Sequence, residues 1–346
     1  MECGSLLPLF SASLLAPHVS KYRVSVHGQQ AVPRSGRKRQ QAAALQSGEI
    51  HGSRLPSQAG LSFRRRDRIF KSGTNMGQAR KRQISSPTNS MLKVYRRALA
   101  KGTTREGWLA VEGPFLVEEA LGAAPAVRIH SVLAAESGLA KFARLMEKLP
   151  AEAEAVQVPD RLFEQVAQTQ NPQGIAALVE LPPHNLDTIL GGQNLLLLVA
   201  CGVQDPGNLG TIMRSAAAFG VSALFTLQET VCPFNPKAVR SSAGAIFRLP
   251  VLADFAADEL LDRLRAAQVR IIAADRHSPS PLHEADLRGS LAIMVGREAS
   301  GLPPEIAREA SLLLSIPIRP GMDSVNVATA ASVFLYEVTR QRGFRY

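Results

Sequence analysis

The stretch Leu291–Leu302, with the sequence LAIMVGREASGL, decides the fold class of this chain. Its first five residues are apolar without interruption, which is typical of a parallel strand covered on both faces. The seven residues that follow are rich in glycine and carry the charged side chains Arg297 and Glu298. Open α/β sheets bind their ligands at the carboxyl ends of such strands. The stretch therefore predicts an α/β fold with a ligand-binding loop after this strand.

Two other loops follow predicted strands in the same way. Asp205–Arg214, DPGNLGTIMR, comes after an apolar run at Leu195–Ala200, and a helix starts within it. The free N–H groups at that helix start could hold an anion such as phosphate. Ile316–Val327, IPIRPGMDSVNV, leads from the last predicted strand, Leu312–Ile316, into the last helix. The three loops are the candidate site.

The alternation of strands and helices divides the chain into two α/β domains. We assign residues 1–75 to a disordered basic tail, 76–104 to an N-terminal helical segment, 105–181 to a small α/β domain, 182–193 to a linker and 194–346 to a larger α/β domain with a mostly parallel sheet. Strands are expected at Trp108–Val111, Val127–Ala134, Ala155–Val158, Gly174–Val179, Leu195–Ala200, Ala223–Thr226, Phe247–Leu252, Val269–Ala273, Leu291–Val295 and Leu312–Ile316. Helices are expected at Pro114–Leu121, Leu139–Leu149, Asp160–Ala167 and at about 84–104, 208–219, 236–244, 256–267, 303–309 and 324–341.

The positive charge of the chain is concentrated near its N-terminus. Residues 1–75 hold 12 basic and 3 acidic side chains, whereas the whole chain holds 40 and 29. The tail is therefore a weak argument for a nucleic-acid partner of the folded part. It is either an organelle transit peptide or an extension upstream of a true start at Met76. In the predicted helix after it, Lys93, Arg96, Arg97 and Lys101 share one face, which is either a solvated face or a contact for RNA phosphates.

Several function classes are disfavoured by composition and by missing motifs. The longest apolar run, Leu195 to Cys201, is far shorter than the roughly 20 residues that span a membrane. Three cysteines do not indicate a disulfide framework, and no histidines or cysteines have zinc-ligand spacing. The chain lacks the glycine-rich dinucleotide fingerprint, the P-loop and the hydrolase nucleophile elbow. We expect a reduced, soluble, cytoplasmic protein, or an organellar one if the tail is a transit peptide.

Taken together, the three loops resemble the motifs of the SpoU (TrmH-like) family of RNA ribose 2′-O-methyltransferases, in the SPOUT superfamily. Asn208, Gly210 and Arg214 resemble the first motif; Val325 stands where the family usually has leucine in the third. A weaker similarity covers 84–181, where Thr169–Ala176, TQNPQGIA, is similar to the end of the family's L30e-like RNA-binding domain. The second motif is similar to Gly296, Glu298, Gly301 and Leu302 of this chain. The third is similar to Ile316-Pro317 followed by Ser324-Val325-Asn326-Val327.

The resemblance implies a fold, a cofactor and partners. It implies that the C-terminal domain is a SPOUT domain whose last segment is threaded into a trefoil knot, preceded by an L30e-like domain that binds RNA. It implies S-adenosyl-L-methionine as cofactor and a C2 homodimer. Because cysteines and histidines at ligand spacing are lacking, we expect the cofactor to bind without metal. The resemblance implies as substrate the 2′-hydroxyl of an RNA ribose, with ribosomal RNA favoured over transfer RNA by the extra N-terminal domain. Two alternatives from other classes remain. One is a non-catalytic RNA-binding or ribosome-assembly protein, and the other is an S-adenosyl-L-methionine enzyme of a different knotted family that modifies a base.

The resemblance also implies roles for individual residues. Arg214 clamps a phosphate and stabilises the developing oxyanion, because a guanidinium stays protonated and is a poor base. Asn208 and Glu298 order Arg214 and the RNA. The implied catalytic residues are Arg214, Asn208, Glu298, Ser324 and Asn326, and the implied cofactor-binding residues are Gly296, Gly301, Leu302, Ile316 and Val325, which use mainly their backbone.

Each of these residues also has a purely structural interpretation. Arg214 could be a surface arginine of a helix, and Glu298 could cap the next helix or form an ion pair. Ser324 could be the N-cap of the last helix, a position that serine favours. Asn208 and Asn326 could be turn residues, and the two glycines could only supply positive φ. The stripe Val327, Ala331, Phe334 and Val338 predicts core or a dimer interface.

Overall fold

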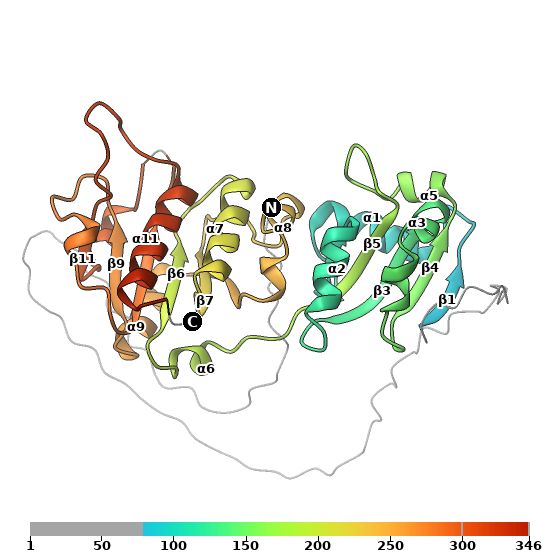
Figure 1. The fold of residues 1–346 in the computed structure, drawn as a ribbon, viewed down its shortest axis with the longest axis horizontal. Coiled ribbons are helices and arrows are strands. Elements are labelled where there is room, and N and C mark those ends of the chain that lie inside the picture. The colour runs from blue at the N-terminus through green and yellow to red at the C-terminus, as the bar shows by residue number, and fades with distance from the viewer. Residues whose placement is uncertain (1–78, 299, 345–346) are drawn as a thin grey trace, which may run out of the picture. The chain divides into compact units, whose positions relative to one another are not determined.

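The computed structural model describes residues 79–298 and 300–344 (Figure 1). The expectations for the basic tail, residues 1–75, lie outside this described part. Within it the chain forms two sheets, each with helices on both faces.

The first sheet is mixed and has five strands. They are β1 (Arg80–Gln83), β2 (Leu109–Glu112), β3 (Arg128–Ala135), β4 (Glu154–Val158) and β5 (Ile175–Glu180). Their order across the sheet is β1-β4-β3-β5-β2. β1, β4 and β3 are parallel, whereas β5 runs antiparallel to both of its neighbours.

The helices of this domain cover both faces of the sheet because strand residues alternate between two apolar cores. α1 (Ser90–Lys101) and α5 (Asp160–Glu164) cover one face, where Tyr95 and Phe163 are buried. α2 (Pro114–Gly122) and α4 (Ala143–Glu147) cover the other with Leu116 and Met146. α3 (Glu136–Lys141) lies between β3 and α4 in the chain.

The segment 76–104 is not only helical, because it opens with a strand that the sequence analysis missed. β1 has the sequence RKRQ and pairs with β4 from Arg80 to Gln83. As an edge strand it buries almost no side chains, so it lacks the apolar alternation that predicts a strand. The helix itself is present: Asn89 caps α1 by accepting the N–H of Met91 at 2.9 Å.

The linker 182–193 contains a short helix that was also missed. α6 (Leu186–Leu190) begins after Asn185, whose side chain accepts the N–H of Thr188 at 3.1 Å. Its apolar side chains are partly buried against the second sheet. Five residues give too little periodicity to predict a helix from the sequence.

The second sheet is fully parallel and has six strands. They are β6 (Leu196–Ala200), β7 (Ala223–Leu227), β8 (Val251–Phe255), β9 (Arg270–Ala274), β10 (Leu291–Val295) and β11 (Leu312–Leu314). Their order is β11-β9-β10-β6-β7-β8. The expected α/β class with a mostly parallel sheet is confirmed, and the apolar run Leu291–Val295 forms β10 with those bounds.

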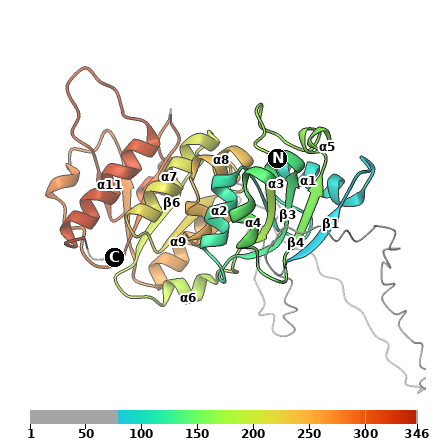
Figure 2. The same ribbon diagram turned by 45° about the vertical axis from the view of Figure 1, so that its right-hand side comes forward.

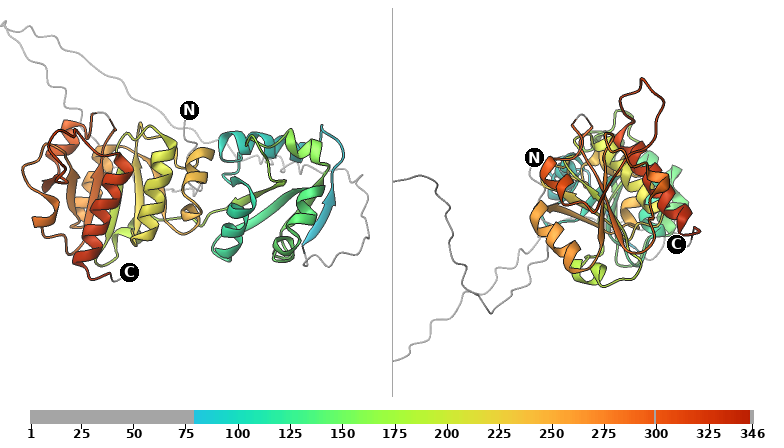
Figure 3. Two further views of the ribbon diagram at one scale, coloured as in Figure 1. Left: turned by 45° about the horizontal axis from the view of Figure 1, so that its top comes forward. Right: turned by 90° about the vertical axis from the view of Figure 1, so that its left-hand side faces the viewer.

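Helices lie on both faces of this sheet as well, as the end-on view in Figure 3 shows. α7 (Pro206–Ala218) and α11 (Val327–Gln341) cover one face and lie side by side in Figures 1 and 2. α9 (Ala257–Ala266) and α10 (Pro304–Arg308) cover the other. α8 (Pro236–Ser241) packs on α7. The faces separate because alternate residues of β6 join different cores, for example Leu196 and Leu197.

One predicted strand of this domain begins later than expected. The sequence predicted a strand at Phe247–Leu252, but Ala245–Phe247 form a turn of 3-10 helix and β8 starts at Val251. Phe247 lies in that turn and packs into the core, with 4% of its surface exposed. Burial, and not strand geometry, explains this part of the apolar run.

The last helix has two faces of different character. The stripe predicted as core or interface is core, because Val327, Ala331, Phe334 and Val338 are all buried in this chain. A second stripe, with Val333 and Tyr336, is exposed. None of the helices in the described residues could span a membrane.

Candidate active site at the carboxyl end of the parallel sheet

The three loops predicted from the sequence meet at one end of the second sheet. β6 and β10 are parallel neighbours, so the loops that follow them leave the same edge. The segment after β11 returns to this edge and enters α11 beside α7. A chain of hydrogen bonds between side chains joins all three loops, although its members are about a hundred residues apart in sequence.

This chain begins at Asn326, the N-cap of α11. Its Oδ1 accepts the backbone N–H groups of Ala328 at 2.9 Å and of Thr329 at 3.4 Å. Its Nδ2 donates to Oδ1 of Asn208 at 3.0 Å. Asn326 therefore satisfies the start of the last helix and holds a second residue of the site at the same time.

The chain continues from Asn208 to a carboxylate. Nδ2 of Asn208 donates to Oε1 of Glu298 at 2.9 Å. Because the helix start needs the oxygen of Asn326, its nitrogen must face Asn208, and Asn208 must turn its own nitrogen towards Glu298. The direction of the amide groups is therefore fixed by the helix.

Glu298 is held as a charged carboxylate. Partial burial raises the pKa of Glu298, but hydrogen bonds from Asn208 and from nearby backbone amides, those of Gln204 and Asp205 included, outweigh burial and lower the pKa below its ordinary value. Neither structural alternative for Glu298, a helix cap or an ion pair, is found among the described residues. The N-cap of α10 is Pro303, with no side-chain cap, and Glu298 forms no ion pair within the described residues.

The start of α7 is closed by a side chain, so the expectation of a phosphate there is wrong. Oδ1 of Asp205 accepts the N–H of Asn208 at 2.9 Å, and Nζ of Lys237 donates to Oδ2 at 2.7 Å. These bonds, led by that of Lys237, lower the pKa of Asp205. The pair Asp205-Pro206 is the sequence signal for this cap, because aspartate favours the N-cap and proline the first helical position.

Glycine is needed at positions 296 and 301 for different structural reasons. A Cβ on Gly296 would lie 2.2 Å from the carbonyl carbon of Gly301 and 2.3 Å from the nitrogen of Leu302, so no side chain fits there. Gly301 has φ of +71°, and a Cβ on it would meet nothing within 4 Å. Two backbone hydrogen bonds between Arg297 and Gly301, of 2.9 and 3.0 Å, close the loop. Positive φ thus explains Gly301, whereas close backbone approach explains Gly296.

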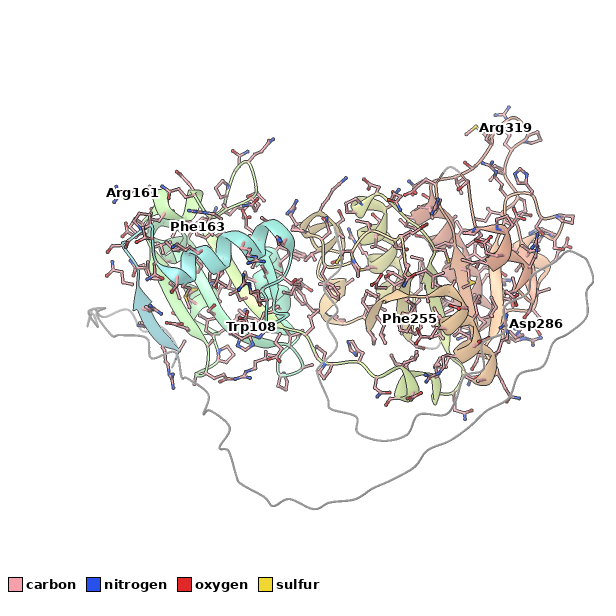
Figure 4. All side chains as sticks on the ribbon, turned by 180° about the vertical axis from the view of Figure 1, so that it is seen from behind. Trp108, Arg161, Phe163, Phe255, Asp286 and Arg319 are labelled. Atoms are coloured by element: carbon pink, nitrogen blue, oxygen red, sulfur yellow. The ribbon has the colours of Figure 1, made fainter. Side chains whose placement is uncertain are left out.

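The cofactor-binding residues predicted from the sequence offer unpaired backbone groups. Within the described residues, the N–H and C=O groups of Leu302, Ile316 and Val325 make no hydrogen bond. The loop from Ile316 to Asn326 is largely exposed, and Figure 4 shows Arg319 on its outer part. Donors and acceptors of this kind, beside the open space over Gly301, fit a group recognised by its polar edges, such as a purine.

The sequence analysis missed a second set of contacts beneath this site. Arg297 pairs with Glu229 and lies against Gly202, where an added Cβ would be 2.6 Å from the arginine Nε. Gln204 donates to the carbonyl groups of Gly202 and Glu229. These contacts join the loops after β6, β7 and β10. No local pattern predicts them, because the partners belong to three separate loops.

The side chains of Arg214 and Ser324 are exposed and make no hydrogen bond or ion pair within the described part of the chain. Ser324 does not cap α11, since Asn326 does. Gly210 lies in the interface of α7 and α8, where a Cβ would be 2.4 Å from the carbonyl oxygen of Ala238. The catalytic roles of Arg214 and Ser324 remain predictions. No group of three or more His, Cys, Asp or Glu that could hold a metal occurs among the described residues.

Comparison with known proteins matches both domains. Residues 195–336 match the SpoU rRNA Methylase family, and residues 94–177 match the MRM3-like substrate binding domain. A relative from Bacillus subtilis, "23S rRNA (guanosine(2553)-2'-O)-methyltransferase RlmP", is 31% identical over 258 residues, which are 74% of this chain and 99% of the relative.

Two solved structures have the same fold. The AdoMet-bound rRNA methyltransferase from Sinorhizobium meliloti has a TM-score of 0.66 and 28% identity, covering 76% of this chain and 98% of that one. The SpoU methyltransferase AviRb from Streptomyces viridochromogenes, in complex with AdoMet, has a TM-score of 0.64 and 25% identity, covering 73% and 98%. The sequence match to these relatives, together with the parallel sheet and the three joined loops, shows that this chain belongs to the SpoU rRNA methylase family.

Proposed function

We propose that this chain transfers the methyl group of S-adenosyl-L-methionine to a ribose 2′-hydroxyl in ribosomal RNA. The observation that carries the proposal is the hydrogen-bonded chain of Asn326, Asn208 and Glu298, which joins the three motif loops at one edge of the sheet. The relatives named for ribosomal RNA and the neighbours that hold AdoMet support the same reaction.

The residues present fit S-adenosyl-L-methionine. When bound, the sulfonium of this cofactor supplies a methyl group that is already activated. The unpaired backbone groups of Leu302, Ile316 and Val325 would hold it, and the close packing of Gly296 on Gly301 keeps the loop of Leu302 in place. The remaining tasks of the protein are the alignment of the hydroxyl and the handling of its proton.

Arg214 is the residue that we assign to the ribose. Its guanidinium is exposed on α7, the helix that also carries Asn208, and it has no partner among the described residues. An uncommitted guanidinium can clamp a phosphate and stabilise negative charge that develops on the 2′-oxygen. It is a poor proton acceptor, so we do not assign Arg214 the role of general base. Ser324 and the charged Glu298 are the residues left for contact with RNA.

The first domain is our proposed RNA-binding domain, with the L30e-like fold that the sequence implies. It contains the residues that match a substrate-binding domain. Lys93, Arg96, Arg97 and Lys101 are all exposed on α1. Nε of Arg96 donates to the carbonyl of Gln165 at 3.0 Å, and the other donors of the four cations are available to RNA phosphates.

We also propose that the protein works as a C2 homodimer through α11. Val333 is 36% and Tyr336 is 49% exposed, and Phe344 beside them is 45% exposed. An exposed apolar stripe on a helix that begins inside the site suits an interface that lies near the site in both protomers.

The trefoil knot is part of the same proposal. The residue after β11, Ser315, exchanges backbone hydrogen bonds with the connection between β9 and β10, at 2.9 Å to Ser280 and 2.8 Å from Leu282. The chain then returns across the sheet to α11, whose Gln341 donates to Ala285 of that same connection at 2.9 Å. These contacts support threading of the last segment through this connection.

The test is to map 2′-O-methylated nucleotides in RNA from cells with and without this gene, in ribosomal and transfer RNA separately. We expect one or a few ribosomal sites to lose methylation. Loss in transfer RNA only would contradict the substrate, and no change would favour a non-catalytic ribosome-assembly protein. Separate cytoplasmic and organellar fractions test the proposed cytoplasmic location against an organelle.

A further inference from the structure

A pocket of about 270 Å³ is lined mainly by residues of the first domain, with Arg240 of α8 as the one lining residue from the second, and by no residue of the three motif loops. It lies where β2 passes into α2, beside the loop that leads into β5. Gly113 makes this junction possible, since it has φ of +99° and a Cβ on it would meet nothing within 4 Å. Its N–H donates to the carbonyl of Ile175 at 2.9 Å, which fixes the junction to the start of β5.

The loop on the other side of the pocket is held in place by a buried carboxylate. Glu112, at the end of β2, is only 8% exposed. It accepts the N–H of Gln168 at 2.8 Å, the N–H of Thr169 at 3.4 Å and the hydroxyl of Thr169. A charged group with several such bonds is expensive to rearrange, so the loop is preorganised. The side chains of Asn171 and Gln173 beyond it stay exposed to the pocket.

An aromatic ring forms the apolar wall of the pocket. Phe115 is 55% exposed, although its neighbours Leu116 and Val117 on α2 are buried in the core. The ring is therefore available for a ligand. The start of α2 at Pro114 also lines the pocket, and this helix start has no side-chain cap.

We infer that this pocket, the Phe115 pocket, takes one unpaired nucleobase of the RNA substrate. The base stacks on Phe115, and the amide groups of Asn171 and Gln173 bond to its polar edge. Proteins recognise single-stranded RNA in this way, with an aromatic ring for the face of a base and amides for its edge. Bases inside a duplex present no free face, so the pocket selects a loop, bulge or strand end. This inference rests on the proposed function, since it names a contact for the same RNA.

The test uses the full-length protein and a fluorescent single-stranded oligouridylate of about 12 nucleotides, a length within the usual site sizes for single strands. A strand of equal length without bases has the same phosphates and serves as the second probe. We expect Phe115→Ala to weaken binding of the oligouridylate about 5- to 100-fold, the range for loss of one stacked base. Binding of the abasic strand should not change.

Three variants control the interpretation. Phe115→Tyr keeps a ring and should bind as the original protein does. Asn171→Ala should weaken only the base-containing strand. Val94→Ala removes another exposed apolar side chain, 41% exposed on α1, and should have no effect on either probe.

The outcomes separate this inference from the proposed reaction. Equal loss on both strands, or no loss for Phe115→Ala, would overturn the Phe115 pocket even if methyl transfer occurs. If the original protein prefers the oligouridylate to the abasic strand and Phe115→Ala loses this preference, the result supports the pocket even if no methylated nucleotide is found. In a methylating protein, the variant should raise KM for RNA and leave kcat nearly unchanged, because no residue of the three motif loops lines the pocket.

Discussion

Asn208 and Asn326 show how single amide groups build this site. Each amide offers one acceptor and two donors, so two in series can connect a helix start to a carboxylate. Aspartate at either position would remove a donor, and alanine would break the connection. The charged state of Glu298 is therefore a property of the whole hydrogen-bonded chain.

Removal of Asn208 should raise the pKa of Glu298 towards its ordinary value. Glu298 now has a lowered pKa, so its bond to Asn208 contributes stability at neutral pH that is lost as the pH falls through that value. The stability difference between the original protein and Asn208→Ala should shrink on acidification. Carboxyl carbon NMR titration measures the pKa directly. Asn185→Ala, which removes the cap of α6, should leave the Glu298 titration unchanged.

Arg214→Ala should abolish methyl transfer and leave cofactor binding nearly unchanged. The guanidinium is on α7, whereas the cofactor residues are on the loops after β10 and β11. A charge-assisted bond to a developing oxyanion contributes about 3–4 kcal/mol, or roughly 100- to 1000-fold in rate. Single-turnover methylation and calorimetric titration of the cofactor measure the two effects. Arg214→Lys should rescue poorly, because an ammonium lacks the planar fork.

Near-normal turnover of Arg214→Ala would contradict the role of Arg214 and move attention to Glu298 or Ser324. The sequence identifies these residues as candidates, because the motif spacing places them at strand ends. The bonds between them depend on the sheet order, which puts β6 beside β10, and no local pattern contains that order. Asp205 could have been predicted as a cap from Asp205-Pro206, but its bond to Lys237 on α8 could not.

At the scale of elements, the loop after β10 depends on the absence of one side chain. Gly296→Ala should destabilise the loop and weaken cofactor binding, because the new Cβ would collide with the backbone of Gly301 and Leu302. Overpacking of this kind costs about 1–3 kcal/mol of folding stability. Thermal unfolding and cofactor titration measure both effects. Gly289→Ala is the control, since its φ of +76° brings strain without collision; equal loss of cofactor affinity in both variants would contradict the mechanism.

The exposed face of α11, with Tyr336, is the proposed dimer interface. Tyr336 packs edge-on against Phe219, with ring centroids 6.3 Å apart, yet remains half exposed. Tyr336→Asp should weaken the proposed dimer by about 2 kcal/mol or more, roughly 30-fold, as for a buried aromatic at an interface. Sedimentation across a concentration series measures the change. Val94→Asp on α1 should have no effect, and an original protein that stays monomeric at micromolar concentration would contradict the dimer.

Long, apolar elements were predictable from the sequence, and short or exposed ones were not. β10 and α7 bury a continuous or periodic set of apolar residues, so their pattern is local. β1 is defined only by its pairing with β4, and its charged side chains do not indicate that pairing. The same limit applies to Phe247, where an apolar residue reports burial but not the shape of the backbone.

At the scale of the whole molecule, the donor set predicts binding of the cofactor without metal. The candidate cofactor residues offer backbone groups, and the described part of the chain has no cluster of metal-binding side chains. Calorimetric titration with S-adenosyl-L-methionine in chelator should give one site per protomer. Affinity that falls on addition of chelator, and returns with one divalent metal, would contradict this prediction.

Asn326 follows Asn208 and Glu298 along the chain, and this order has a consequence for synthesis. During synthesis, β6, α7 and β10 can leave the ribosome and pair before α11 exists. Asn208 then lacks its partner, and the side of α7 that α11 later covers stays open to water. The active centre is thus completed only when α11 has been made, after the loops that carry Asn208 and Glu298. A nascent chain that stops before Val327 should hold a formed sheet and no working site, so premature termination there yields a protein without activity.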